Sequence, residues 1–378
     1  MKNIAYVFGT RPEAIKMAPL ISATAESSRF NAITILTGQH PTMAREVLDW
    51  FGLVPNFEQT IDRSDPSLNG LVSQLILQVG QALKDCMPDL VVVQGDTASA
   101  LAGALAAFNL ELPVAHVEAG LRTDDINSPY PEEAYRQMIS RIAQINLCPT
   151  PWNKSNLLSE GIDESSIMIT GNTVVDAFAL MSGRMPHGAR KDIAEKQKTI
   201  LVTVHRRENL GGRLIEITKA IKELAIRNQD FRFVLPMHPN PKVRQILIPS
   251  LGEMKNVSLI EPLGYPDFLA ELENSTFVLS DSGGVQEEAP ILGVPVLVMR
   301  DNTERPEGLM TGGMKLVGAN ALDIVSAAEE LIYSPQLRDS MATAMNPFGD
   351  GLASARTISA FLKFFGLGQR QSEYVGHS

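Results

Sequence analysis

The sequence has few cysteines and no excess of basic residues, and each scarcity argues against a class of protein. The 378 residues include only two cysteines, Cys86 and Cys148, which are too far apart for a disulfide framework or a zinc site. Both lie in apolar sequence, so we expect two buried free thiols. The net charge of −10 argues against a nucleic-acid binder, which needs a basic face.

Long apolar runs and nucleotide-binding fingerprints are also absent. No run approaches the length of a membrane span, and the opening MKNIAYVFGTRPE reads as a strand and a turn rather than a signal peptide. We therefore expect a soluble cytoplasmic protein. The sequence contains no GK[ST] loop, GxGxxG fingerprint or zinc spacing, which disfavours a kinase or a nicotinamide dehydrogenase and predicts no metal or cofactor.

Short apolar runs alternate with helical patterns along the chain. The runs are continuous, as in strands buried on both faces of a parallel sheet. Their repetition predicts an α/β fold with two Rossmann-like doubly wound domains. The predicted strands are Ile4–Phe8, Ile33–Leu36, Leu90–Val93, Val114–Val117, Ile145–Cys148, Ile200–Val204, Phe231–Pro236, Val257–Ile260, Phe277–Leu279 and Val296–Val298. The predicted helices of the first half are Pro12–Ala25, Leu68–Leu83, Ala98–Phe108 and Glu132–Ala143.

The domain boundaries follow from a change in composition. Residues 181–198 are rich in Gly, Pro, His and charge, as in a linker. We place an N-terminal domain at 1–178 and a C-terminal domain at 179–350. The helical segment of residues 351–378 has no strand after it, which permits a return to the first domain.

The stretch from 276 to 305 predicts a phosphate site. A buried strand stops at an SGG turn and feeds a helix, which presents free N–H groups and the positive end of a helix dipole. The glycines let a phosphate approach the backbone, and an acid one helical turn inside lies within reach of sugar hydroxyls. An ordinary strand-to-helix turn is the alternative. The candidate residues are Ser282, Gly283, Gly284, Glu288 and Arg305.

Charged residues follow other predicted strands, at the edge where such folds bind ligands. Arg11 and Lys16 begin a helix, where cations suit an anionic ligand but not the helix dipole; solvated surface charge is the alternative. Asp96 and Glu118 each end a strand and form a candidate pair for proton transfer, although Asp96 could instead cap the next helix. Glu132 is a further acid/base candidate.

The second half adds a histidine at the same kind of position. His205 directly follows a predicted strand and precedes two arginines, and imidazole is a natural acid/base group near neutral pH. A structural histidine is the alternative. His238 is a second candidate with weaker support.

An ordered set of motifs resembles a known family. The motifs are FGTRPEAIK, TGQH, QGDT, HVEAGLRT, SPYPEEAYR, HRREN, SDSGGVQEEAP and RDNTERPE, and they run from about Ile4 to Gly318. Together they resemble the bacterial non-hydrolysing UDP-N-acetylglucosamine 2-epimerases. The resemblance implies two domains of the glycosyltransferase-B type that face a cleft, and a homodimer.

The resemblance also implies a reaction. UDP-N-acetylglucosamine would lose its C2 proton and eliminate UDP, which gives 2-acetamidoglucal. UDP would then re-add, with a proton delivered to the opposite face of C2, to give UDP-N-acetylmannosamine, an activated sugar for surface polysaccharide synthesis. The partner is a UDP-sugar, and no cofactor or metal is implied.

Roles carry over position by position from the resemblance. Ser282, Gly283 and Gly284 would hold the diphosphate, Glu288 the ribose, and Phe268 would lie near the uracil. The charge of the departing UDP would be offset by Arg11, Lys16 and Arg305. Proton transfer and sugar positioning would fall to Asp96, Glu118, Glu132 and His205.

Many relatives bind a second, activating UDP-N-acetylglucosamine beside the substrate. The positions associated with that pocket are Gln39, Glu132, Arg206 and His238. This chain departs from the usual pattern at Pro41-Thr42 and at Asp65, so the resemblance leaves activation open.

The motifs mainly describe a UDP site and the chemistry at C2, so several alternatives stay open. These are a 2-epimerase of a related UDP-2-acetamido sugar, a hydrolysing 2-epimerase, a UDP-sugar glycosyltransferase and a non-catalytic sugar-nucleotide sensor.

Overall fold

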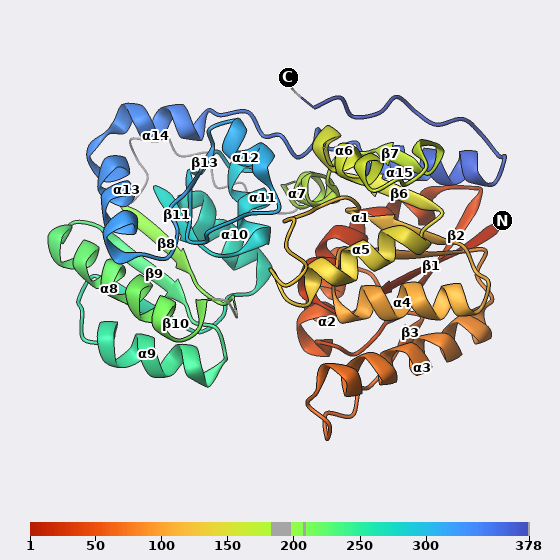
Figure 1. The fold of residues 1–378 in the computed structure, drawn as a ribbon, viewed down its shortest axis with the longest axis horizontal. Coiled ribbons are helices and arrows are strands. Elements are labelled where there is room, and N and C mark those ends of the chain that lie inside the picture. Colours follow the sequence, from red (N-terminus) through yellow and green to blue (C-terminus); the bar gives the residue numbers. More distant parts are fainter. Residues whose placement is uncertain (183–197, 207–208, 377–378) are drawn as a thin grey trace. The chain divides into compact units, whose positions relative to one another are not determined.

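The computed structural model describes residues 1–182, 198–206 and 209–376, and the chain divides into two compact units. Unit 1 comprises Met1–Arg184 and Phe348–Ser378, and unit 2 comprises Met185–Pro347. Each unit has one parallel sheet with helices against it (Figure 1). The predicted α/β fold class with two doubly wound sheets is therefore confirmed. The predicted linker lies almost entirely outside the described residues.

Unit 1 contains a seven-stranded sheet in the order β3-β2-β1-β4-β5-β6-β7. Its strands are β1 Lys2–Phe8, β2 Phe30–Leu36, β3 Phe57–Glu58, β4 Leu90–Gln94, β5 Val114–Val117, β6 Ile145–Cys148 and β7 Ile167–Ile169. Its helices are α1 Arg11–Glu26, α2 Pro41–Phe51, α3 Leu68–Cys86, α4 Ala98–Asn109, α5 Glu132–Ile142, α6 Pro151–Ser159, α7 Thr173–Ser182 and α15 Ala353–Phe364, with a 3₁₀ turn at Glu164–Ser166.

The strand order of unit 1 reverses between β1 and β4. Helix α4 packs against α3 and α5, whereas α1 packs against α2, α7 and α15. The two groups of helices cover opposite faces of the sheet, which explains why β4 is apolar from Leu90 to Val93, all of which are fully buried. The carboxyl ends of β1 and β4 therefore form the switch point at which such sheets bind ligands.

Unit 2 contains a six-stranded sheet in the order β10-β9-β8-β11-β12-β13. Its strands are β8 Thr199–Thr203, β9 Arg232–Pro236, β10 Val257–Ile260, β11 Phe277–Ser280, β12 Val296–Val298 and β13 Met314–Leu316. Its helices are α8 Gly212–Arg227, α9 Pro241–Leu251, α10 Tyr265–Asn274, α11 Gly283–Ile291, α12 Pro306–Met310, α13 Ala321–Tyr333 and α14 Pro335–Ala342.

The order of unit 2 reverses between β8 and β11, which pair in register from Ile200 with Phe277 to Thr203 with Ser280. The residues that follow these two strands meet at the second switch point. That register brings the segment after Thr203 beside the turn that opens α11.

The C-terminal segment packs on unit 1. Helix α15 lies against α1 and α7, and the buried Asp176 of α7 accepts hydrogen bonds from the N–H groups of Ala353 (3.2 Å) and Ser354 (2.7 Å). These two bonds satisfy donors that a helix N-terminus otherwise leaves unpaired. Beyond the helix, Tyr374 donates its N–H to the carbonyl of Ile169 at 2.9 Å.

The cysteines follow the prediction only in part. Both are free thiols and Cys148 is buried, but Cys86 is partly exposed. Cys86 is the last residue of α3, where the helix runs out to the surface. In the described part of the chain, no helix combines the length and the apolar character needed to cross a membrane.

Candidate active site

Glu13 joins the two loops at the switch point of unit 1. Its carboxylate accepts hydrogen bonds from the N–H groups of Gly9 (3.0 Å) and Thr10 (2.8 Å) after β1, and from the Thr97 hydroxyl (2.6 Å) after β4. Complete burial raises the pKa of Glu13 to about 7, although these hydrogen bonds oppose the shift. The loops that carry Arg11 and Asp96 are therefore fixed to each other.

Glu118 is the most enclosed of the predicted acid/base residues of unit 1. It directly follows β5, and its backbone is left-handed, with φ at 65°, a conformation that non-glycine residues adopt mainly where the surroundings enforce it. Its carboxylate accepts hydrogen bonds from Lys16, Gln94 and, at 3.3 Å, Asn172.

Lys16 and Glu118 form a buried ion pair, with side chains 6% and 7% exposed. The alternative that Lys16 is solvated surface charge is therefore wrong. Removing either residue would leave the other as an uncompensated buried charge. The burial of each residue therefore depends on the presence of the other.

Asp96 is held by an arginine rather than used as a helix cap. Arg136 of α5 donates hydrogen bonds to Asp96 from Nε, at 3.0 Å, and from Nη2. The remaining nitrogen of the guanidinium, Nη1, donates to Glu133 at 3.0 Å. The residue that caps α4 is Thr97, whose hydroxyl accepts the N–H of Ala100 at 3.0 Å. The alternative role for Asp96 as the cap is wrong because Thr97, one position later, already satisfies that donor.

Three other predicted residues of unit 1 lie at the start of helices or just before them. Glu132 is the first residue of α5 and Arg11 the first of α1. Gln39 precedes α2, and its Oε1 accepts hydrogen bonds from the Ser99 N–H (3.0 Å) and hydroxyl (2.7 Å). The side-chain oxygen of Gln39 thus ties the loop after β2 to α4.

The phosphate motif of unit 2 forms the turn that it predicts. Ser282 is the N-cap of α11, with extended backbone, and Gly283 is the first helical residue. A Cβ built on Gly283 would lie 2.9 Å from Nη1 of Arg305 and 3.1 Å from Nη2 of Arg206. Two guanidinium groups therefore lie at the positive end of the helix, a combination that suits an anion.

Arg305 is fixed in this position by acids. It donates from Nε to Glu287 at 2.6 Å and from Nη1 to Glu304, which also binds the buried Arg300 at 2.8 Å. Glu288 is 7% exposed, and its Oε2 lies 3.9 Å from the Cβ position of Gly284. Both cations and acids thus surround the first turn of α11.

The two predicted histidines of unit 2 lie together. The ring of His205 is 6.1 Å from that of His238, centroid to centroid, and the planes are 20° apart. His238 Nδ1 accepts the N–H of Asn240 at 3.1 Å. Phe268 lies on α10 and is partly buried.

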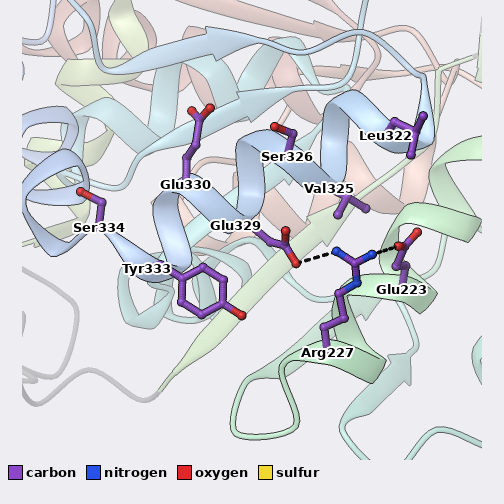
Figure 2. Close-up of a pocket in the computed structure, with 9 residues that line it drawn as sticks. All are labelled: Glu223, Arg227, Leu322, Val325, Ser326, Glu329, Glu330, Tyr333 and Ser334. Atoms are coloured by element: carbon purple, nitrogen blue, oxygen red, sulfur yellow. Dashed lines mark hydrogen bonds and ion pairs between the residues drawn. The ribbon is translucent and has the colours of Figure 1, made fainter.

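A hollow of about 520 Å³ lies elsewhere on unit 2, between α8 and α13 (Figure 2). Its central cation, Arg227, pairs with Glu223 of its own helix and, at 3.0 Å, with Glu329 of α13 (Figure 2). None of the predicted site residues lines it. Among the described residues, no group of three or more His, Cys, Asp or Glu could hold a metal ion.

The sequence also matches known proteins. The family model described as UDP-N-acetylglucosamine 2-epimerase matches residues 22–362. The chain belongs to the UDP-N-acetylglucosamine 2-epimerase family. It is 43% identical over 372 residues to the UDP-N-acetylglucosamine 2-epimerase of Bacillus subtilis (98% of each chain). It is 42% identical over 367 residues to that of Escherichia coli K12 (95% of this chain and 98% of the relative).

Solved structures of the family have the same fold. An S. aureus MnaA–UDP complex superposes with a TM-score of 0.93 at 41% identity, covering 99% of this chain and 100% of that one. The Neisseria meningitidis UDP-GlcNAc 2-epimerase bound to UDP-GlcNAc has a TM-score of 0.92 at 41% identity, covering 96% and 100%.

Several residues around the site were missed by the sequence reasoning. Arg136, Asn172 and Asp281 each contact a predicted site residue. Arg136 and Asp281 are charged residues within motifs that resemble those of the family, so both could have been predicted as site residues from the sequence. Asn172 follows the short strand β7, which the sequence does not reveal, so nothing marked it.

Proposed function

We propose that this protein catalyses the reversible conversion of UDP-N-acetylglucosamine to UDP-N-acetylmannosamine without net hydrolysis. The observation that carries the proposal is family membership over residues 22–362, with a relative at 41% identity bound to UDP-GlcNAc. The chemistry of the two switch points agrees with it, because one gathers carboxylates and the other gathers cations at a helix start.

Unit 2 would bind the UDP moiety. The diphosphate would accept hydrogen bonds from the N–H groups at Gly283 and Gly284, where α11 begins. Arg305, held by Glu287, would offset its charge, and we include Arg206 because its guanidinium lies at the same helix start. Glu288 would bind the ribose hydroxyls and Phe268 would lie near the uracil.

Unit 1 would carry out the proton transfers at C2. One carboxylate removes the C2 proton while the bond from C1 to the diphosphate oxygen breaks and its electrons leave with UDP, which gives 2-acetamidoglucal. UDP then re-adds to C1 as a proton reaches the opposite face of C2. Asp96 and Glu118 are the main candidates because each lies at the sheet edge beside a cation, Glu118 buried and Asp96 partly exposed, and Glu132 completes the set.

The setting of the reaction is also part of the proposal. The product would be activated N-acetylmannosamine for the synthesis of surface polysaccharide, and the enzyme would be a cytoplasmic homodimer. Gln39 and His238 would belong to a second UDP-sugar pocket.

The test is to incubate the protein with UDP-N-acetylglucosamine alone, and separately with UDP-N-acetylmannosamine, and to separate the products by anion-exchange chromatography. The proposal predicts the same final mixture of the two UDP-sugars from either side. Free UDP with N-acetylmannosamine would instead identify a hydrolysing 2-epimerase. If UDP-N-acetylglucosamine does not react but a related UDP-2-acetamido sugar is epimerised, the proposed substrate is wrong. If the protein instead transfers the sugar to an added acceptor, the proposed reaction is wrong.

A further inference from the structure

Asp281 is a buried carboxylate at the switch point of unit 2 to which no role has been given. It follows β11 directly and is 0% exposed. It accepts hydrogen bonds from the backbone N–H groups of His205 (3.1 Å) and Arg206 (2.9 Å), and from the Asn209 amide (3.0 Å). The pairing of β8 with β11 sets this geometry, because it places the segment after β8 beside the end of β11.

Asp281 also contacts the side chain of His205. The distance from His205 Nδ1 to Asp281 Oδ1 is 3.1 Å. Burial alone would raise the pKa of Asp281, but His205, the Arg206 N–H and Asn209 outweigh it and lower the pKa to about 2. An ionised carboxylate can only accept hydrogen bonds, so this 3.1 Å contact is a hydrogen bond when Nδ1 of His205 carries the proton.

The orientation of the His205 ring follows from this contact. With Nδ1 directed at the buried carboxylate, Nε2 lies on the opposite side of the ring, and the His205 side chain is 39% exposed. The ring of His238 lies on one side of the His205 ring, with centroids 6.1 Å apart and planes 20° apart. Arg206, the next residue, reaches the start of α11.

We propose that Asp281 is a positioning residue for the reaction, which holds His205 in the Nδ1–H form and presents Nε2 to the diphosphate of the substrate. The proposal rests on the proposed function. When the bond from C1 to the diphosphate oxygen breaks, negative charge grows on UDP. His205 in its imidazolium form, with Nδ1–H held by Asp281, would then donate a hydrogen bond to UDP from Nε2–H. On re-addition the same hydrogen bond would weaken as UDP bonds to C1.

The decisive variant is Asp281→Asn, which keeps the size of the side chain. Its oxygen can still accept backbone N–H groups, but a neutral amide does not stabilise the imidazolium form of His205 as the carboxylate does. We expect kcat to fall about 100-fold, as for loss of an acid/base contribution, and the midpoint of thermal unfolding to fall by a few degrees, because the lowered pKa of Asp281 shows that its ionised form also stabilises the fold.

A double-mutant cycle separates positioning from a structural role. If Asp281 acts through His205, then Asp281→Asn in a His205→Gln background lowers kcat no further, because the group that it positions is gone. If the two losses multiply instead, Asp281 acts independently of His205 and the proposal is wrong.

A measurement on the unaltered enzyme keeps the proposal testable even if Asp281→Asn fails to fold. Imidazole ¹⁵N NMR reports which ring nitrogen is protonated in the neutral form, and the His205→Gln variant assigns the signal among the six histidines. We expect Nδ1–H for His205, and an Nε2–H form would overturn the proposal. If His205 is in the Nδ1–H form but the enzyme does not convert UDP-N-acetylglucosamine, the pairing stands and the proposed function fails.

Discussion

The substitution Gly283→Ala tests whether the two arginines at the start of α11 bind the diphosphate. The new methyl group would lie 2.9 Å from Nη1 of Arg305 and 3.1 Å from Nη2 of Arg206, closer than carbon and nitrogen normally approach. The atoms that must move are the ends of two flexible side chains rather than backbone. The fold should therefore survive, while both guanidinium groups are displaced from the helix start.

The expected loss of affinity follows from the bonds at stake. A hydrogen bond between charged groups contributes about 1.5–3 kcal/mol, and each 1.4 kcal/mol is about a tenfold change in affinity. Weakening one such bond to the diphosphate should raise the Kd for UDP about 10- to 100-fold. Stability should hardly change, because the cost of displacing the two flexible side chains is offset by the better helix propensity of alanine, about 1 kcal/mol.

The assay is titration calorimetry with UDP, and the chain supplies a matched control. Gly212 is likewise the first residue of a helix in unit 2, and no described atom lies within 4 Å of its Cβ position. Gly212→Ala should bind UDP like the unaltered protein. Unchanged UDP affinity in Gly283→Ala would refute the assignment of the two arginines, and equal losses in both variants would show an effect of alanine itself.

Three further predictions concern unit 1. Asp96→Asn should lower turnover about 10²- to 10⁴-fold, as for loss of a general base, while calorimetry shows near-normal UDP binding; unchanged turnover would refute its role. Lys16→Met should destabilise the protein by about 3 kcal/mol in urea unfolding because Glu118 is left buried without its cation, and adding Glu118→Gln should recover part of that loss; simple addition of the two effects would contradict the coupling. The raised pKa of Glu13, about 7 against an ordinary 4.5, means that the folded state holds this proton more tightly. Stability should therefore fall by about 3 kcal/mol as pH rises from 4.5 to 7, and a Glu13→Gln variant with the same pH dependence would exclude Glu13 as its source.

The strands that the sequence revealed were those with a continuous apolar run. Val114–Val117 and Ile145–Cys148 are buried throughout and match the observed bounds, because such a run between turns leaves little choice of bounds. The edge strand Val257–Ile260 also matches, although only Val257 is buried. The strands β3, β7 and β13 were missed. Each has two or three residues and lies at a sheet edge, so it lacks the length that makes a pattern visible.

The site residues that sequence reasoning could find were those that end a strand or begin a helix. Asp96, Glu118 and His205 could be located in this way because parallel strands deliver their carboxyl ends to one edge. Their contacts could not be found, since Arg136 reaches Asp96 across 40 residues of sequence and Asp281 reaches His205 across 76. The left-handed backbone of Glu118 also leaves no trace in residue type.

The motif predicted the position of Arg206 in the chain but not the direction of its side chain. The resemblance connects Arg206 with a second sugar nucleotide, and in the structure its guanidinium lies beside Gly283 and Arg305. A one-dimensional motif gives the position of an arginine in the chain, but the direction of a long side chain depends on the acids around it, here Glu304 at 3.6 Å.

The most direct test of the account is proton NMR of UDP-N-acetylglucosamine with the purified protein in D₂O, with no acceptor, metal or nicotinamide added. Elimination and re-addition of UDP require that the C2 proton be lost and a solvent proton be taken up. The account therefore predicts UDP-N-acetylmannosamine that carries deuterium at C2, without accumulation of free UDP. UDP-N-acetylmannosamine that retains its original C2 hydrogen, or no product at all, would contradict it.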